Sequence, residues 1–241
     1  MPFPVTYLLD QFAPSETFIR RELEQLRRRK WNVFERYLKG DTDTLNFSLA
    51  SCPESYRWRF FKAASARILK ELPTAPRSAC RIIRRLPQAA HLIKQTLDSD
   101  SRLIHAQFAG MTADLASIAA QTLERPWTCS VHAHDVFTES PRALYRRLGT
   151  AACVVACSQQ AADTVLKAGL PRENVYVSHH GLPLHDYPLE KSQPDGALFC
   201  ACRLEEKKGL DTLLQACHLL VNRGLHFTCA IAGEGPCKDN L

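Results

Sequence analysis

The chain has 241 residues, of which 45% are hydrophobic and 23% charged, values typical of an ordinary globular protein. No apolar run approaches the roughly 20 residues that a membrane-spanning helix needs, so we expect no such helix. The net charge of +6 suits an anionic partner but does not identify one.

Short β-rich runs alternate with helical patterns along the chain, which predicts an α/β fold with a parallel sheet. The run "AACVVACS" is continuously apolar, as expected when helices cover both faces of a sheet. We expect helices to begin near Thr17, Thr112 and Pro141, and after Ser158, which would act as a cap. The strands are predicted at 5–9, 33–38, 102–109, 127–134, 151–158 and 174–181.

Two prolines and several polar residues in "YPLEKSQPDG" predict a linker at 188–196. It would separate a first domain, 1–187, from residues 197–241. The second part reads as strand 197–202, helix 210–222 and strand 226–232. This single βαβ unit is too short for an independent parallel-sheet domain, so we expect a partial domain with much of its sheet exposed.

Residues 56–95 carry ten cations against one acid, Glu71. Apolar residues between the cations predict basic amphipathic helices, broken at Pro73, Pro76 and Pro87. One interpretation is a solvated helical face, and another is contact with an anionic membrane. We expect no nucleic acid as a partner, because no nucleic-acid-binding motif accompanies the charge.

The ten cysteines lie mostly in apolar runs, where a free cysteine behaves as a small hydrophobe. No CxxC pair has the spacing of zinc ligands, so we expect reduced thiols and no metal site. Reduced thiols indicate a reducing compartment, the cytoplasm.

Cations surround the expected start of the helix at 210–222: Arg203 directly follows the preceding strand, and Lys207 and Lys208 come after it. A helix N-terminus already carries partial positive charge, so added cations indicate an anion such as a diphosphate between them. The alternative is a solvated turn in which Glu205 and Glu206 pair with the lysines.

The stretches "ACRLEEKKGLDTLLQACHLL" and "FTCAIAGEGP" resemble the family 4 glycosyltransferases of the GT-B fold. "PSETFIRRELEQLRRRKWNV" looks like the opening of the branch that builds exopolysaccharide and colanic-acid-type polymers. "IHAQFA", "SVHAHD", "VVACSQQAADTVLKAG" and "VYVSHHGL" follow in the order of that family. The resemblance implies a complete N-terminal Rossmann-like parallel-sheet domain and a partial second Rossmann-like domain. The basic segment, 48–98, would be a helical insertion.

The resemblance also implies a retaining, metal-independent transferase. It would move a sugar from a nucleotide-diphosphate sugar to a polysaccharide or lipid-linked glycan, without a cofactor. Arg203 and Lys208 would bind the donor diphosphate and stabilise the leaving charge. His132 matches the active-site histidine of the family, although a histidine after a buried strand is often a satisfied polar residue. We expect all three side chains in one cleft.

Further residues of the cleft follow from the same comparison. His134 and Asp135 would orient His132 or the acceptor, and Gly181 would form a tight turn at the cleft floor. Ser15, Glu16 and Thr17 would contact acceptor or phosphate, or cap the first helix. We expect a cytoplasmic protein, peripheral at the inner membrane through residues 56–95.

Three positions depart from the family pattern. Cys202 replaces a glycine, and Leu182-Pro183 replaces an acidic residue. The family's paired glutamates, which have seven residues between them, do not occur before Leu241. We therefore expect a truncated second domain and impaired catalysis. The competing hypotheses are a non-enzymatic remnant that binds acceptor or membrane, and an α/β protein that binds another anionic ligand.

Overall fold

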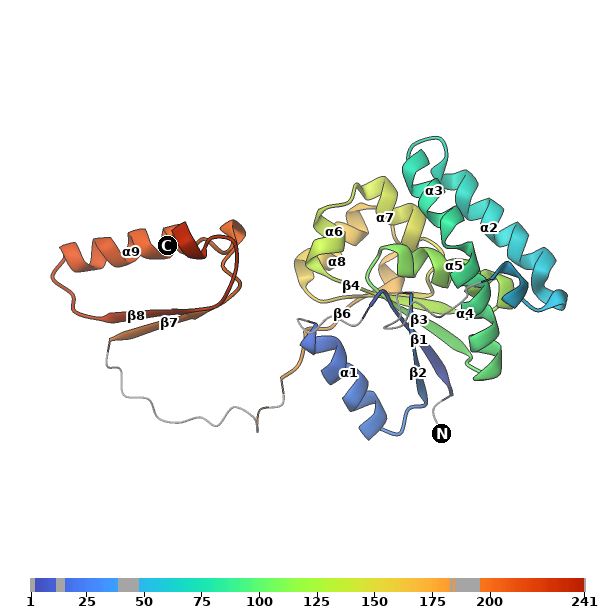
Figure 1. Cartoon of the computed structure of the whole chain (residues 1–241), viewed down its shortest axis with the longest axis horizontal. Helices are drawn as coiled ribbons and strands as arrows, with labels where there is room; N and C mark the ends of the chain where they lie inside the picture. The colour runs from blue at the N-terminus through green and yellow to red at the C-terminus, as the bar shows by residue number, and fades with distance from the viewer. Residues whose placement is uncertain (1–2, 12–15, 39–47, 183, 185–195, 241) are drawn as a thin grey trace. The chain divides into compact units, whose positions relative to one another are not determined.

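The structure is a computed structural model that describes residues 3–11, 16–38, 48–182, 184 and 196–240. The chain divides into two compact units, Met1–Leu182 and Pro183–Leu241, and each is described by itself (Figure 1). The division lies just before the predicted linker.

The first unit contains a six-stranded parallel sheet with the strand order β2-β1-β3-β4-β5-β6. The α/β fold class predicted from the sequence is confirmed, and each observed strand lies within a predicted one. The strands are β1 Val5–Leu9, β2 Val33–Tyr37, β3 Leu103–Gln107, β4 Trp127–Val131, β5 Cys153–Ala156 and β6 Val175–Val177.

Helices connect these strands. Ser140 and Ser158 accept hydrogen bonds from the backbone of the first turns of α7 and α8, so the predicted cap at Ser158 is confirmed. Gly169, with φ +102°, follows α8 and takes a left-handed conformation that suits glycine. The helices are α1 Thr17–Arg28, α2 Arg57–Glu71, α3 Pro76–Arg84, α4 Leu86–Asp98, α5 Met111–Leu123, α6 Ala133–Phe137, α7 Pro141–Leu148 and α8 Gln159–Lys167.

The two faces of the sheet pack differently. Leu8 of β1 belongs to the main core with α2–α5, whereas its neighbours Tyr7 and Leu9 pack with α1 on the opposite face (Figure 1). Beyond α1, this second face is only partly covered within the described residues: Tyr176 on β6 is 57% exposed. The side chains of β5, which the "AACVVACS" run contains, are buried or half-buried as predicted, whereas β6 at the sheet edge is exposed on Tyr176 and Val177.

The basic segment forms three helices, α2, α3 and α4, as predicted. Pro76 opens α3 and Pro87 lies in the first turn of α4, which agrees with the predicted breaks. These helices are part of the main core rather than a solvated attachment, because each buries apolar side chains against it. The buried set includes Phe60, Ala64, Ile82, Ala89 and Ile93.

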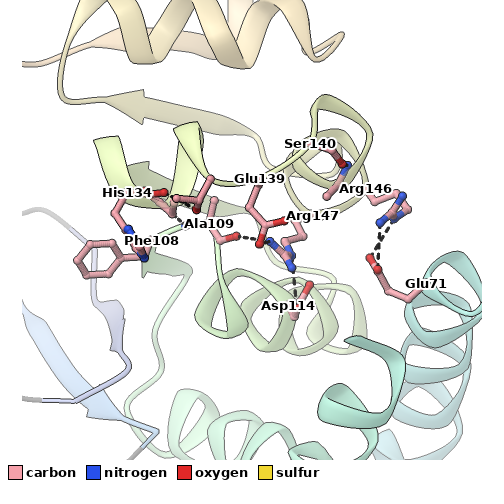
Figure 2. Close-up of polar contacts among 12 residues, drawn as sticks. Glu71, Phe108, Ala109, Asp114, His134, Glu139, Ser140, Arg146 and Arg147 are labelled. Carbon is pink, nitrogen blue, oxygen red and sulfur yellow. Dashed lines mark hydrogen bonds and ion pairs between the residues drawn. The ribbon is translucent and has the colours of Figure 1, made fainter. Parts of the chain in front are cut away.

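A buried ionic network ties the basic segment to α5 and α7. Arg67 of α2 donates to Asp114 of α5 at 3.0 Å and to Glu71 at 2.7 Å. From α7, Arg146 donates to Glu71 at 3.1 Å and Arg147 lies 3.8 Å from Asp114. Figure 2 shows both α7 arginines directed at these carboxylates. The one acid of the basic segment is thus an internal partner of its cations.

The second unit consists of β7 Ala197–Ala201, α9 Leu210–Asn222 and β8 Thr228–Ala232, with the two strands parallel. The predicted βαβ order is confirmed. Side chains on both strands are largely exposed, Phe199 by 73%. Throughout the described part of both units, no helix combines the length and the apolar character that crossing a membrane requires.

Candidate functional site

His132 directly follows β4 and precedes α6, at the carboxyl edge of the sheet. The predicted strand at 127–134 is therefore too long, because the chain turns into α6 at this histidine. Asp135 stabilises the turn: its Oδ1 accepts from the His132 backbone N–H at 2.8 Å, and its Oδ2 accepts from Ala109 N–H. The His132 side chain is only 8% exposed.

Hydrogen bonds fix which ring nitrogen of His132 carries the proton. The amide Nε2 of Gln107, at the end of β3, donates to the Tyr7 hydroxyl and to Glu22 at 3.2 Å. The Gln107 Oε1 is therefore an acceptor, and His132 Nε2 lies 2.8 Å from it. His132 must donate through Nε2, which leaves a lone pair on Nδ1.

The Nδ1 atom of His132 is buried and makes no hydrogen bond of normal geometry among the described residues, although the side chain takes a capping-box position toward the backbone N–H of Asp135. Burial, with a smaller contribution from nearby His180, lowers the pKa of His132 to about 4. The imidazole is therefore neutral at pH 7, and Nδ1 is a basic atom able to accept a hydrogen bond or a proton. A buried polar atom without a partner is uncommon and points to a ligand.

Aromatic rings hold His132 in place. Phe18 of α1 and Phe108 after β3 lie with ring centroids 4.8 Å and 4.6 Å from the imidazole. His180, which follows β6, stacks on His132 at 5.3 Å with an interplanar angle of 15° and also contacts Phe18. The site therefore combines side chains from α1, β3, β4 and β6.

The other predicted residues of this unit take different positions. His134 lies on α6 with an exposed side chain, while Asp135 is buried and acts on His132 through the backbone. Gly181 is exposed and its φ is not positive, and its predicted place in a tight turn at the cleft floor stays a prediction. Ser15 lies outside the described residues.

Glu16 and Thr17 lie at the start of α1. Thr17 is the first helical residue, and the side chain of Glu16 makes no cap hydrogen bond. Burial and the charge of Asp10 raise the pKa of Glu16. Glu16 borders a small pocket between α1 and the carboxyl ends of β1 and β2, whose other lining residues are Leu9, Gln11, Ile19, Arg20, Leu23, Arg27, Glu35 and Tyr37.

In the second unit, Arg203 and Lys208 lie in the loop between β7 and α9. Glu205 pairs with Arg203 at 2.9 Å and with Lys207 at 3.0 Å, so the alternative of internally paired charges is partly correct. Lys208 has no ion pair within the described residues. Gly209 caps α9 with φ +64°, a conformation that a glycine adopts without strain.

The "GEGP" turn packs directly on this loop. Leu204 N–H donates to Glu234 O at 2.9 Å, and Cys202 N–H donates to Ala232 O at 3.0 Å. A Cβ at Gly233 would lie 1.8 Å from the Cys202 carbonyl oxygen, so only glycine fits there. The two motifs form one interlocked structure at the carboxyl ends of β7 and β8.

The sequence profile of Glycosyltransferase Family 4 matches residues 15–186, more than half of the 241 residues. The chain belongs to Glycosyltransferase Family 4. Among curated proteins, the chain is 32% identical over 83 residues to a colanic acid biosynthesis glycosyltransferase, WcaL, assigned as putative in Escherichia coli K12. This match covers 33% of the chain and 20% of WcaL.

Solved structures with the same fold include Anabaena HepE in complex with UDP and glucose, with TM-score 0.54 and 15% identity. The galactosyltransferase WaaB of the lipopolysaccharide outer core has TM-score 0.61 and 12% identity. The chain is covered to 99% and 98%, but it spans only 63% of HepE and 62% of WaaB. At these identities the likeness establishes the GT-B fold, as the sequence resemblance implied.

The Family 4 segment contains His132 and its surroundings, whereas Arg203 and Lys208 lie beyond it. That these cations share a cleft with His132 stays a prediction. Sequence reasoning missed Gln107, Phe18 and His180 as parts of the site. All three lie within stretches that carry the family resemblance, but no local pattern singled them out.

Proposed function

We propose that this Family 4 chain acts in the transfer of a sugar from a nucleotide-diphosphate sugar to a polysaccharide or lipid-linked glycan acceptor. The proposed reaction retains the configuration of the sugar and requires neither a metal ion nor a cofactor. The supporting observation is the free lone pair of His132 Nδ1, held neutral and correctly oriented at the carboxyl edge of the sheet.

Each candidate residue has a defined task in this proposal. His132 Nδ1 accepts a hydrogen bond from a hydroxyl of the reacting sugar and fixes its orientation. Arg203 and Lys208 neutralise the charge that develops on the leaving diphosphate. Lys208 has no ion pair within the described residues, and Glu205 must release Arg203 or share it for a diphosphate to bind.

A uridine diphosphate sugar is the first donor to test, because the HepE structure contains UDP and glucose. The likeness to WcaL suggests a glycan acceptor of the colanic-acid type. The experiment measures nucleotide release and sugar transfer with uridine, guanosine and adenosine diphosphate sugars, with and without a chelator.

Matched variants sharpen this test. His132→Ala removes the lone pair, and Arg203→Ala removes a phosphate ligand, so both should lower kcat/KM by about 100-fold or more. His134→Ala, two residues away on an exposed face, tests whether any histidine loss has this effect. Equal loss in His132→Ala and His134→Ala would contradict the role of His132. If none of the nucleotide sugars raises the thermal unfolding temperature of the protein, the whole proposal is contradicted.

We further propose that the basic segment attaches the protein to an anionic membrane surface. Trp58, Phe61 and Leu69 recur at helical spacing on α2 and are 78%, 49% and 63% exposed. Exposed cations flank this apolar stripe, a combination that suits interfacial binding. The exposed cations of the segment are Arg57, Arg59, Lys62, Lys70, Arg77, Arg81, Arg84 and Lys94.

Vesicle co-sedimentation tests this attachment. We expect binding to vesicles with phosphatidylglycerol, weakening as salt shortens the screening length below about 10 Å, and little binding to phosphatidylcholine alone. Trp58→Ser combined with Leu69→Ser should reduce binding. Tyr145→Ser is the matched control, since Tyr145 on α7 is 50% exposed outside the segment. Binding indifferent to salt, lipid charge and these variants would refute the attachment.

A further inference from the structure

A second chemical feature surrounds His132. One ring nitrogen each of His132 and His180 and the Sγ of Cys157 all lie within 4.8 Å of one another. His132 directly follows β4, Cys157 directly follows β5, and His180 lies shortly after the end of β6. These three strands are neighbours in the parallel sheet. The topology therefore gathers two imidazoles and a thiol at one edge.

This spacing is close to that of a metal site. Zinc binds histidine nitrogen at about 2.0 Å and cysteine sulfur at about 2.3 Å, which places tetrahedral ligands roughly 3.3–3.8 Å apart. The distances between the three ligand atoms exceed these values by about an ångström at most, a difference that a side-chain rotation can close. His180 is exposed and can rotate, while His132 is fixed.

His132 is already arranged as a ligand. Its Nδ1 is buried, makes no hydrogen bond of normal geometry among the described residues, and carries the lone pair because Nε2 donates to Gln107. Metal-binding histidines commonly donate their second ring nitrogen to an oxygen in this way, which fixes the ring and its protonation. Phe18 and Phe108 pack on the same ring and restrict its movement.

We propose that His132, Cys157 and His180 bind a thiophilic divalent cation, with zinc as the best match to two nitrogens and one sulfur. Binding displaces the thiol proton of Cys157 to solvent and forms a metal–thiolate bond. Three protein ligands leave the fourth position of a tetrahedral site to water.

The consequence for activity rests on the proposed function. A metal on His132 Nδ1 takes the lone pair that a sugar hydroxyl would otherwise use. Zinc is therefore an inhibitor of a transferase whose chemistry needs no metal, and the same histidine cannot serve both ligands at once.

Cobalt binding tests the site without any activity measurement. Co²⁺ is added to the metal-free, reduced 241-residue chain, and absorbance is followed for the thiolate-to-cobalt charge-transfer band and the intense visible bands of tetrahedral cobalt. We expect one equivalent with both signatures, displaced by Zn²⁺. Cys157→Ser should remove the charge-transfer band, and His180→Ala should weaken binding by about 10-fold or more.

Two further variants separate this site from background binding by the other cysteines and histidines. Cys153→Ser is the matched control, since Cys153 lies at the opposite end of β5, and it should retain both signatures. Gln107→Ala should lower affinity by about 10- to 100-fold, because His132 Nε2 loses the oxygen that fixes its ring. Circular dichroism confirms that each variant is folded.

The proposal is overturned if cobalt binds without a charge-transfer band, or if Cys157→Ser and Cys153→Ser behave alike. Zinc inhibition of sugar transfer is measured separately, and should be lost in His180→Ala. Metal binding in a chain that transfers no sugar would refute the proposed function while leaving the metal site supported.

Discussion

The buried network around Arg67 provides a quantitative test of the fold. Replacing Arg67 by Met keeps the apolar stem and removes the guanidinium that joins Asp114 to Glu71. These side chains are 3%, 2% and 1% exposed, so water cannot replace the lost partner. Glu71 keeps Arg146, but the remaining cation near Asp114 is Arg147, at 3.8 Å.

The cost should be large because a carboxylate is left buried and poorly paired. Removing one partner of a buried ion pair typically costs about 3–5 kcal/mol. The total stability of a domain is about 5–15 kcal/mol, so the loss should be plain in the unfolding midpoint. Asp114→Asn added to Arg67→Met removes the stranded charge, and should recover part of the loss.

Arg59→Met is the matched control. Arg59 also lies on α2 and pairs at 2.8 Å with Glu124, the residue that ends α5, but the two side chains are 49% and 69% exposed. Exposed pairs contribute about 0–1 kcal/mol. Urea unfolding followed by circular dichroism measures all variants. If Arg67→Met and Arg59→Met lose the same stability, or the double variant is the least stable, the reasoning is wrong.

Further outcomes follow from the geometry. Gly233→Ala should destabilise the second unit and weaken donor binding, because its Cβ would lie 1.8 Å from the Cys202 carbonyl oxygen. Gly181→Ala is the control: its Cβ would enter open space, so thermal stability should not change. Burial, followed by the charge of His132, lowers the pKa of His105 to about 4. As the pH falls, His105 of the unfolded chain takes up a proton before His105 of the folded chain does. The free energy of unfolding should therefore be unaffected by His105 above about pH 6.5, and should fall by about 2–3 kcal/mol through this residue as the pH approaches 4. Urea midpoints across this range should show a shallower pH dependence in His105→Asn than in the parent; an unchanged slope would contradict the assignment.

Local sequence patterns predicted the strands and most helix boundaries. A run such as Val5–Leu9 defines a strand by its own composition, and Ser158 caps α8 through a bond to Ala161, three residues away. The exception is α6, a five-residue helix directly after His132. It is too short to show helical periodicity, so "SVHAH" read as one strand.

The surroundings of His132 were harder to predict because they depend on tertiary contacts. The motif identified His132. Its partner Gln107, however, lies at the end of β3, 25 residues earlier in the chain, and His180 follows β6, later in the chain. The expectation of no metal site relied on CxxC spacing, a local pattern. A ligand set drawn from the ends of three strands has no such spacing in the sequence.

Charge composition alone predicted only part of the basic segment. Most of its cations are exposed, as ten cations with one acid suggested, yet Glu71 is 1% exposed and receives hydrogen bonds from Arg67 and Arg146. Burial raises the pKa of Glu71, but these arginines outweigh it and keep the pKa below its usual value. A single acidic residue in a segment rich in cations is therefore a good candidate for a buried partner of arginines.

The network also reaches the candidate site. Arg147, which faces Asp114, donates to the Ala109 carbonyl at 3.3 Å (Figure 2). The Ala109 N–H in turn donates to Asp135, and Asp135 accepts from the His132 backbone at 2.8 Å. A chain of hydrogen bonds, interrupted by the 3.8 Å ion pair between Arg147 and Asp114, thus joins the helices of the basic segment to the turn that carries His132. These helices hold α5 and α7 in place, and through them the orientation of the imidazole, so a change at Arg67 should disturb the site as well as the fold.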